Sequence, residues 1–555
     1  MSTLQMNFRQ GRLVRFMKGA APPPRVLLTA LLVCLYAAAR MRRLTAACLW
    51  FDEIFSVHAA RHAWGALWRF AAADLIHPPL FYALLKLWVA AGGESLLWLR
   101  LFPALASIAA VVPLLLLARE LRLGAAATNA ALLVAAANGY LIKYAQEVRM
   151  YGLLLLLTLT SLWLFARLTN SGGRARATLC ALAFVNLLLV YTHYYGWLVV
   201  VCEAAYLGFR DRRRLRGFLF VVTALVAAYA PWAWACARAA GAGGGLAQNI
   251  GWIERPGAGD LVQLFVSFNA PFYFRQSTAE PAYARGGALL GLLLVGVPVV
   301  ALLVGGARRR RAAEKESGKD EGRAEPLRPL PGSVEGAATF LLVFAAVPAA
   351  LAFAASYVLP HSVWGARHLM VAAGPYALLA GLALGSLRPA WWRAGALLLL
   401  CCWFGAVGAL NLVRREGTFV WCAWEGLAAS AARDAARGEP ADLYAFEDLI
   451  AYHLWFALER GGAAGRFRVV SVKGVPGVAE DPAYFLPRDF DGVAVRGADA
   501  LRGESFWAAF RDAEWDESRQ PLKLITERGY RAEHVYETAA QGQRAFLVLF
   551  TRRGG

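Results

Sequence analysis

Long apolar segments recur along most of the chain, separated by short polar loops. A membrane-spanning helix needs about 20 mostly apolar residues. Eleven segments meet or approach that length, at 25–39, 97–118, 125–142, 150–166, 176–190, 197–209, 217–236, 287–304, 336–358, 369–386 and 394–412. The two shortest flank residues 191–196 and form either one broken helix or two. The pattern predicts a polytopic α-helical membrane protein with about eleven transmembrane helices.

The segment 40–96 is too long for a simple turn between two spans. Its apolar stretches, 62–72 and 79–91, are short and carry several aromatic residues. Such stretches suit helices that lie in the membrane interface. Pro78 and Pro79 should start the second helix, because proline is tolerated in a first helical turn. We therefore expect interfacial helices in the first loop.

Residues 413–555 form a second unit with a different pattern. Strand-like runs at 443–446, 467–472, 492–495 and 544–550 alternate there with helix-like runs at 447–459 and 500–512. This alternation predicts a soluble α/β domain, whereas residues 1–412 form the transmembrane domain. Within the transmembrane domain, the charged and Pro/Gly-rich segment 307–333 is predicted to be a cytoplasmic linker between two halves.

The composition agrees with a membrane protein, since 59% of the residues are hydrophobic and 17% are charged. The net charge of +20 comes largely from arginine clusters in short loops, at 9–18, 119–122, 174–176, 210–216, 308–311 and 388–393. Basic short loops face the cytoplasm, so the charge indicates orientation and we expect no nucleic-acid partner. The amino terminus is then inside, and the segments 40–96, 144–150, 237–286, 359–368 and 413–555 lie outside. Arg40, Arg42 and Arg43 depart from this rule, because they follow the first span on the outer side.

Neither cleavage of the amino-terminal segment nor a cysteine framework is expected. The first apolar run lacks a small-residue cleavage site and is predicted to be a retained anchor. The chain contains 8 cysteines, mostly in apolar runs, and none of them forms a C-x-x-C pair. We therefore predict neither a metal cluster nor a disulfide framework.

Asp52 and Glu53 are the first candidates for chemistry. They follow an apolar Leu-Trp-Phe run near the predicted outer boundary of the bilayer. Partial desolvation makes a carboxylate there a stronger base, and ionisable residues near membrane depth are functional candidates. The alternative is that Asp52 caps a helix over 54–60 and Glu53 favours its positive end.

Cations are expected close to these carboxylates. Glu147 and Arg149 stand together in the short turn between two spans, and Arg367-His368 precedes another span. His77 stands before the predicted second interfacial helix, where it is either a ligand or a structural residue. Arginine binds phosphate bidentately, so the outer turns are predicted to hold an anionic ligand.

The order of these motifs resembles that of a known group of enzymes. The motifs are, in order, Trp50-x-Asp52-Glu53, His77-Pro78-Pro79-Leu80-x-Tyr82, Leu99-Arg100-Leu101-Phe102-Pro103-Ala104-Leu105, Gln146-Glu147-x-Arg149-x-Tyr151, Thr192-His193-Tyr194 and Arg367-His368-Leu369. This order resembles the C-type membrane glycosyltransferases over roughly residues 25–390. The most similar group is family 39-like and includes protein O-mannosyltransferases, lipid A aminoarabinose transferases and rhizobial lipopolysaccharide galacturonosyltransferases. Residues 413–555 match no element of that family.

The resemblance implies a glycosyltransferase that moves a sugar from a polyprenyl-phosphate donor to a hydroxyl on the outer face, with inversion. Its catalytic residues would be Asp52 as general base, Glu53 and Glu147. The donor phosphate would contact Arg149, Arg367, His77 and His368. Tyr82, Tyr151, His193 and Tyr194 would line the rest of the site.

The resemblance requires no cofactor and predicts no metal site, although a divalent ion held by Asp52 or Glu147 stays an alternative. The acceptor would be an envelope lipid, a polysaccharide or a protein, in contact with membrane lipids. The high alanine, arginine and glycine content is typical of a GC-rich bacterial genome, so we expect the bacterial cytoplasmic membrane.

Two other interpretations remain open: a transporter or flippase of lipid-linked saccharides, and an inactive relative that only binds them.

Overall fold

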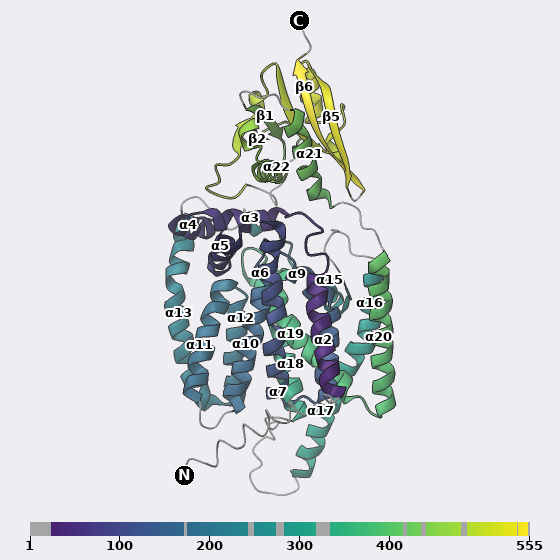
Figure 1. Cartoon of the computed structure of the whole chain (residues 1–555). Helices are drawn as coiled ribbons and strands as arrows, with labels where there is room; N and C mark the ends of the chain where they lie inside the picture. The colour runs from purple at the N-terminus through teal and green to yellow at the C-terminus, as the bar shows by residue number, and fades with distance from the viewer. Residues whose placement is uncertain are drawn as a thin grey trace, which may run out of the picture.

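The computed structural model describes residues 24–170, 175–241, 249–272, 282–317, 333–413, 419–434, 440–478, 486–540 and 542–552. A bundle of long helices carries a separate α/β domain at one end (Figure 1). We refer to the end of the bundle beneath this domain as the domain end. The predicted fold class, a polytopic helical protein with a carboxy-terminal α/β domain, is confirmed.

Eight helical segments among the described residues are long and apolar enough to cross a membrane. They are α2 (Pro24–Met41), the α6 (Leu96–Ala109) and α7 (Val111–Glu120) pair, α10 (Tyr151–Asn170), α13 (Arg212–Gly241), the continuous α16 (Ala282–Gly291) to α17 (Val297–Ser317), α18 (Val334–Val358), α19 (Met370–Ser386) with its preceding 3-10 turn Ala366–Leu369, and α20 (Ala390–Val413). Three further predicted spans are shorter helices: α8 (Ala125–Ala137), α11 (Ala175–Thr192) and α12 (Gly196–Arg210). The segments flanking 191–196 are thus two separate helices.

Close packing of α8 against α19 forms the centre of the bundle. Gly381 and Gly385, one helical turn apart on α19, face α8. A Cβ on Gly381 would stand 2.5 Å from the Ala127 carbonyl oxygen, and one on Gly385 would stand 2.8 Å from the Ala127 Cβ. Small residues let membrane helices approach this closely. The two backbones can therefore pack only with glycine at these positions.

Three short helices occupy the predicted first outer loop: α3 (Phe51–Arg61), α4 (Trp64–Asp74) and α5 (Leu80–Gly92). Figure 1 shows α3 and α4 running across the domain end, at a steep angle to the long helices. α5 begins at Leu80, so Pro79 is its N-cap and the helix starts one residue later than the prolines predict. Two more short helices, α9 (Gly139–Ala145) and α15 (Ala258–Asn269), complete this end.

The predicted linker begins later than its composition indicates. α17 continues to Ser317, ten residues beyond the predicted start at 307. The predicted remainder, 318–332, lies outside the described residues.

The carboxy-terminal domain contains a six-stranded sheet with strand order β3-β2-β1-β4-β6-β5. The strands are β1 (Ala441–Ala445), β2 (Phe467–Lys473), β3 (Ala494–Gly497), β4 (Ser505–Arg511), β5 (Tyr530–Ala540) and β6 (Gln543–Arg552). β1 to β4 pair in parallel, whereas β6 is antiparallel to β4 and β5. α21 (Ala423–Asp434) and α22 (Asp448–Arg460) belong to the core on one face, and α23 (Leu522–Glu527) belongs to the core on the other.

The expected helix at 500–512 is wrong, because this segment contains β4. Its alanines favour a helix, but β4 lies between β1 and β6 with five consecutive buried residues. Burial on both faces of a sheet removes the alternation that marks an exposed strand. Tertiary packing therefore overrides the local preference.

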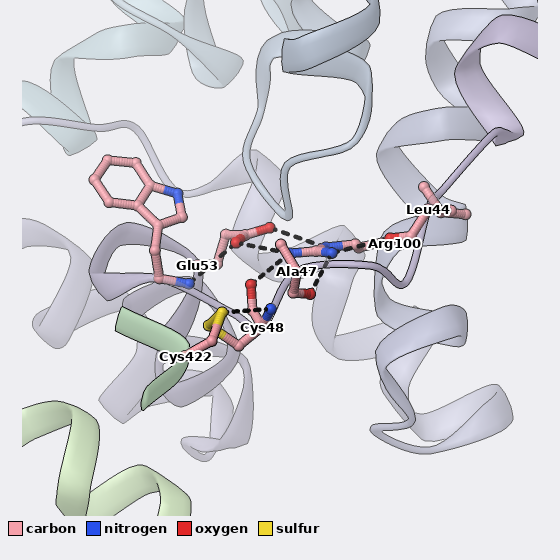
Figure 2. Close-up of a disulfide and its surroundings, with 7 residues drawn as sticks. Leu44, Ala47, Cys48, Glu53, Arg100 and Cys422 are labelled. Carbon is pink, nitrogen blue, oxygen red and sulfur yellow. Dashed lines mark hydrogen bonds and ion pairs between the residues drawn. A yellow bond between two sulfur atoms is a disulfide. The ribbon is translucent and has the colours of Figure 1, made fainter. Parts of the chain in front are cut away.

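A disulfide joins Cys48 to Cys422 across 374 residues of sequence (Figure 2). The prediction of no disulfide framework is wrong for this pair. The spacing of the cysteines in the sequence does not indicate this disulfide. The two cysteines meet only because the fold brings the segment before α3 and the start of the α/β domain together at the domain end. The disulfide links the two domains covalently beside the predicted site.

Side-chain contacts reinforce this link between the domains. The rings of Phe51 on α3 and Tyr452 on α22 lie 5.2 Å apart, and His58 packs edge-on against Trp455 at 5.1 Å. Arg61 forms ion pairs with Glu94 of the bundle and Glu459 of the α/β domain. The α/β domain therefore rests directly on α3, the helix that carries the acidic pair.

Candidate active site

A cavity of about 170 Å³ opens at the domain end, directly above the bundle. Its lining residues are Trp50, Phe51, Asp52, Phe55, Asp74, Ile76, His77, Arg149, Asn249, Ile250, Trp252, Ile253, Arg367, His368 and Pro487. They come from five separate stretches of the bundle and, through Pro487, from the α/β domain. Five residues of the predicted site are among them: Asp52, His77, Arg149, Arg367 and His368.

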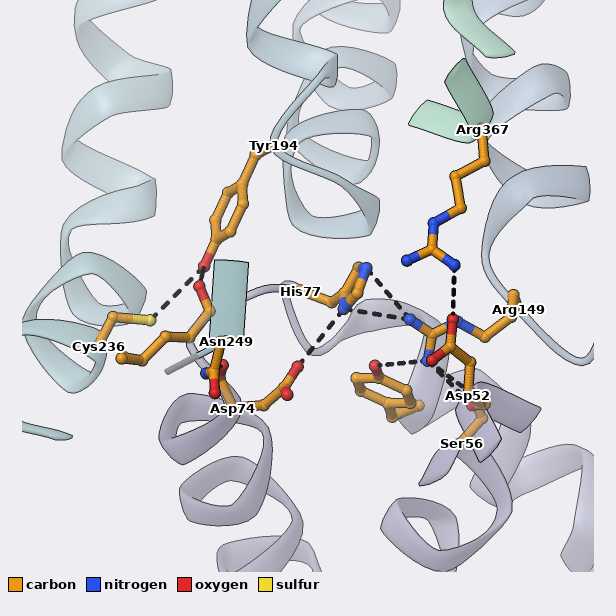
Figure 3. A network of polar contacts seen from close by, with 11 residues as sticks. Asp52, Ser56, Asp74, His77, Arg149, Tyr194, Cys236, Asn249 and Arg367 are labelled. Atoms are coloured by element: carbon orange, nitrogen blue, oxygen red, sulfur yellow. Dashed lines mark hydrogen bonds and ion pairs between the residues drawn. The ribbon is translucent and has the colours of Figure 1, made fainter. Parts of the chain in front are cut away.

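Asp52 lies at the amino-terminal end of α3 and faces two arginines (Figure 3). Its carboxylate Oδ2 accepts a hydrogen bond from Arg367 Nη1 at 2.9 Å, and its backbone oxygen accepts one from Arg149 Nη1 at 3.1 Å. The Asp52 side chain is 18% exposed and that of Arg367 is 28% exposed. This ion pair therefore remains open to a ligand in the cavity.

Arg149 is the more deeply buried cation, with 3% of its surface exposed. Nη1 also lies 3.2 Å from Ser56 Oγ and 3.4 Å from the Tyr82 hydroxyl, and Nη2 lies 3.2 Å from His77 Nε2. Its Nε has no hydrogen-bond partner among the described residues. A buried cation with a spare donor is a strong site for an anion.

Glu53 does not line the cavity, and Figure 2 shows its carboxylate bonded to Arg100. Its carboxylate accepts hydrogen bonds from the Val148 backbone N–H at 2.9 Å and from both Nε and Nη2 of Arg100, at 3.3 and 3.2 Å. It also accepts from the Trp50 backbone N–H at 3.1 Å, which caps α3. The structure thus places Glu53 as the residue that fixes α3 against the 146–150 turn.

Glu147 and the predicted tyrosines lie around the cavity rather than in its wall. Glu147 is buried, and its backbone oxygen accepts from the Arg149 N–H at 2.6 Å. Tyr82 contacts Arg149, whereas the Tyr151 hydroxyl is buried without a hydrogen-bond partner among the described residues. The Tyr194 hydroxyl donates to the Leu75 carbonyl at 3.2 Å and so supports the segment before His77.

Asp74 is a site residue that the motif analysis missed. It is the last residue of α4, and its Oδ2 lies 3.4 Å from His77 Nδ1. Burial, and to a lesser degree the charge of Asp52, raise the pKa of the Asp74 carboxyl to about 7, while Arg149 opposes the shift. The sequence feature that could have identified Asp74 is its position three residues before the histidine of the His-Pro-Pro motif.

His77 and His368, which line the cavity, come together with His193, which is not among its lining residues. One ring nitrogen from each lies within 4.8 Å of the others, and all three side chains are buried. Burial, followed by the charge of Arg149, lowers the pKa of His193 to about 3, so its ring is neutral at physiological pH. By distance alone these residues could hold a metal ion.

The arrangement combines one exposed carboxylate, a second carboxylate that titrates near neutral pH, and two arginines. A carboxylate can take a proton from an approaching nucleophile. The arginines can stabilise negative charge that develops on a leaving group. The cavity therefore suits the displacement of an anionic leaving group by a hydroxyl.

No protein-family profile matches the chain, and no curated protein matches its sequence. Among solved structures, the chain is similar to ArnT from Cupriavidus metallidurans bound to undecaprenyl phosphate, with a TM-score of 0.56 and 13% identity over 94% of this chain and 97% of that one. It is also similar to the archaeal oligosaccharyltransferase AglB from Archaeoglobus fulgidus in complex with an inhibitory peptide and a dolichol-phosphate, with a TM-score of 0.48 and 13% identity over 94% and 74%. The first likeness shows that the chain shares the fold of this ArnT structure over most of its length.

Proposed function

We propose that the protein transfers a sugar from a polyprenyl-phosphate donor to a hydroxyl of an envelope acceptor. The observation that carries this proposal is the Asp52–Arg367 ion pair at 2.9 Å in the wall of a cavity that also contains Arg149. The shared fold with an ArnT structure that holds undecaprenyl phosphate supports a lipid phosphate as part of the donor. The acceptor is a lipid, polysaccharide or protein of the cell envelope.

In the proposed reaction, Asp52 acts as general base. Its carboxylate takes the proton of the acceptor hydroxyl as that oxygen attacks the anomeric carbon from the face opposite the phosphate. A bond forms between the acceptor oxygen and the anomeric carbon, and the bond from that carbon to the phosphate oxygen breaks. The electron pair stays on the phosphate, which leaves as polyprenyl phosphate, and the anomeric configuration is inverted.

The two arginines stabilise the leaving phosphate, so the reaction needs no general acid and no cofactor. Ser56, Tyr82 and His77 hold Arg149 in place. Its guanidinium therefore does not have to move when negative charge develops on the phosphate. Arg367 is fixed from its backbone, because the Tyr140 hydroxyl donates to the carbonyls of Ala366 and Arg367 at 2.8 and 3.2 Å. Glu147 and Glu53 act indirectly by positioning the 146–150 turn.

We place the domain end on the outer side of a bacterial cytoplasmic membrane. The junctions of α7 with α8, of α12 with α13 and of α19 with α20 contain the arginine clusters 119–122, 210–216 and 388–393 and lie at the opposite end of the helices (Figure 1). Basic loops of this kind face the cytoplasm in membrane proteins. The Cys48–Cys422 disulfide also favours this orientation, since disulfides persist in oxidising compartments and are rare in the cytosol. The acceptor then reaches the cavity beneath the α/β domain.

A transfer assay with the purified protein in lipid tests the proposal. Labelled sugars on polyprenyl phosphate are offered with cell-envelope extract, and the label is followed into product. We expect label to move from at least one donor to an envelope component. If no donor is consumed, but lipid-linked sugar crosses the bilayer of sealed vesicles that contain the protein, the protein is a transporter and the proposal is wrong.

A further inference from the structure

Three buried nitrogen atoms around His77 have no hydrogen-bond partner among the described residues. They are Arg149 Nε, His193 Nε2 and His368 Nε2. The side chains of Arg149 and His193 are 3% and 2% exposed, and that of His368 is 9% exposed. Buried polar groups are normally paired. Three unpaired nitrogens in one place therefore indicate a ligand, and their protonation decides whether that ligand is a cation or an anion.

The hydrogen bond on the other side of the His193 ring decides its protonation. The Tyr195 backbone N–H donates to His193 Nδ1 at 3.0 Å, so Nδ1 carries the lone pair. A neutral imidazole has one protonated nitrogen, which is then Nε2. The unpaired His193 Nε2 is thus an N–H donor and has no lone pair for a metal ion.

His77 also lacks a free lone pair. Arg149 Nη2 lies 3.2 Å from His77 Nε2 and 3.3 Å from His77 Nδ1. Since arginine can only donate, it contacts the lone pair of whichever ring nitrogen lacks a proton. Nδ1 also lies 3.4 Å from Asp74 Oδ2, which favours the proton on Nδ1 and the lone pair on Nε2. A metal ion between the three histidines would compete with Arg149 for one ring and meet a proton on another.

The spacing of the rings leaves room for an oxygen atom between them. One nitrogen from each of His77, His193 and His368 lies within 4.8 Å of the others, so a point between them lies within about 2.8 Å of each nitrogen, which is the length of a hydrogen bond. Because the proton on His193 Nε2 and the contact of Arg149 with His77 disfavour a metal ion, the group fits an oxyanion.

We propose that His193 binds the donor phosphate directly, by donating from Nε2 to a non-bridging phosphate oxygen. This inference rests on the proposed function and adds a neutral donor behind the two arginines. The spare Nε donor of Arg149 and the Nε2 of His368 meet the same oxygen or its neighbour. His77 acts indirectly, because it holds the Arg149 guanidinium in place.

Donor binding by single variants of the full-length protein tests this proposal. His193→Ala removes the donor, His193→Gln keeps an amide N–H near the position of Nε2, and His193→Asn places it near Nδ1. We expect His193→Ala and His193→Asn to weaken binding of a polyprenyl-phosphate sugar about tenfold. His193→Gln should recover most of the affinity, and KM should rise more than kcat falls.

His361→Ala is the matched control, since His361 lies in the same 359–368 turn but outside the cavity. It should bind the donor as the unmodified protein does. Elemental analysis of the purified protein should find no stoichiometric metal, and a chelator should leave donor binding unchanged.

Two results would overturn the proposal. One is donor affinity in folded His193→Ala and His193→Gln equal to that of the unmodified protein. The other is one bound metal ion per chain that is lost in both His193 variants. In either case, continued sugar transfer by the unmodified protein would leave the proposed function standing. If the unmodified protein binds no polyprenyl-phosphate sugar, the proposed function fails as well.

Discussion

At the scale of single residues, the site is defined by how each charged group is paired. Asp52 shares its carboxylate with Arg367 at an accessible surface. Glu53, its neighbour in sequence, is fully buried against Arg100. Adjacent residues on a helix point about 100° apart, so one can face the cavity while the other faces the protein interior. The acidic pair therefore divides into a proposed catalytic carboxylate and a structural one.

We expect Arg367→Gln to weaken donor binding about 10- to 100-fold, because it removes one charge-assisted hydrogen bond to phosphate. Its guanidinium pairs with Asp52 and lies over the Trp50 ring at 5.9 Å, and glutamine can keep part of both contacts, so the fold should survive the change. Donor affinity measured by titration checks this. Arg255→Gln removes an exposed cation at the same end and should have no effect. Equal affinity in both variants would contradict the assignment of Arg367 to the phosphate.

Asp74 should make donor binding depend on pH. The pKa of its carboxyl is raised to about 7, so it is protonated and neutral below that pH and negatively charged above it. The groups facing it are His77, Arg149, Asp52 and Arg488. The new negative charge should repel the donor phosphate. We therefore expect affinity to fall as the pH rises through about 7.

Asp74→Asn keeps a neutral side chain and should remove this pH dependence. The sugar-linked donor is a phosphodiester, which lacks the second ionisation that a phosphomonoester has near pH 6. Binding of this donor at several pH values in both proteins makes the comparison. If donor binding depends on pH as steeply in Asp74→Asn as in the unmodified protein, a group other than Asp74 is responsible for the pH dependence.

At the scale of elements, the long apolar helices and most strands could be predicted, because hydrophobic periodicity marks them. The β4 strand could not, since its burial comes from neighbouring strands. The motif order predicts that Asp52, Arg149, Arg367 and the three histidines His77, His193 and His368 belong to one site. It does not predict Asp74, or the close approach of the three rings to one another, because both depend on how loops far apart in the sequence come together in the fold.

The junction of α3 with the 146–150 turn depends on Glu53. Glu53→Gln leaves Arg100 as a buried cation without its counter-charge, which costs about 3 kcal/mol or more. We expect a clear loss of thermal stability, measured by unfolding of the purified protein, as well as reduced activity. Asp52→Asn should leave stability nearly unchanged. Normal stability in Glu53→Gln would mean that this ion pair does not hold the junction.

At the scale of the whole molecule, the α/β domain and the bundle act as one unit around the cavity. The disulfide, the Arg61 ion pairs and the contact of α22 with α3 all lie at the same junction. Pro487 extends the wall of the cavity from the domain side. The α/β domain therefore helps to shape the cavity.

Breaking the disulfide should loosen this junction. A native disulfide typically contributes about 2–5 kcal/mol, so we expect Cys48→Ser with Cys422→Ser to lower the unfolding temperature and the rate of sugar transfer. The Cys401→Ser and Cys402→Ser changes affect exposed free cysteines and serve as the control. Equal unfolding temperatures in the two double variants would show that the disulfide does not stabilise the junction.

The most direct test of the central claim compares the unmodified protein with Asp52→Asn in one experiment that measures both donor binding and sugar transfer. The amide introduced by Asp52→Asn cannot take a proton, but it preserves the size of the side chain and leaves both arginines in place. The account predicts donor binding within a few-fold of the unmodified protein and a loss of transfer of about 100-fold or more. Transfer at the normal rate by Asp52→Asn would contradict the assignment of Asp52 as the base.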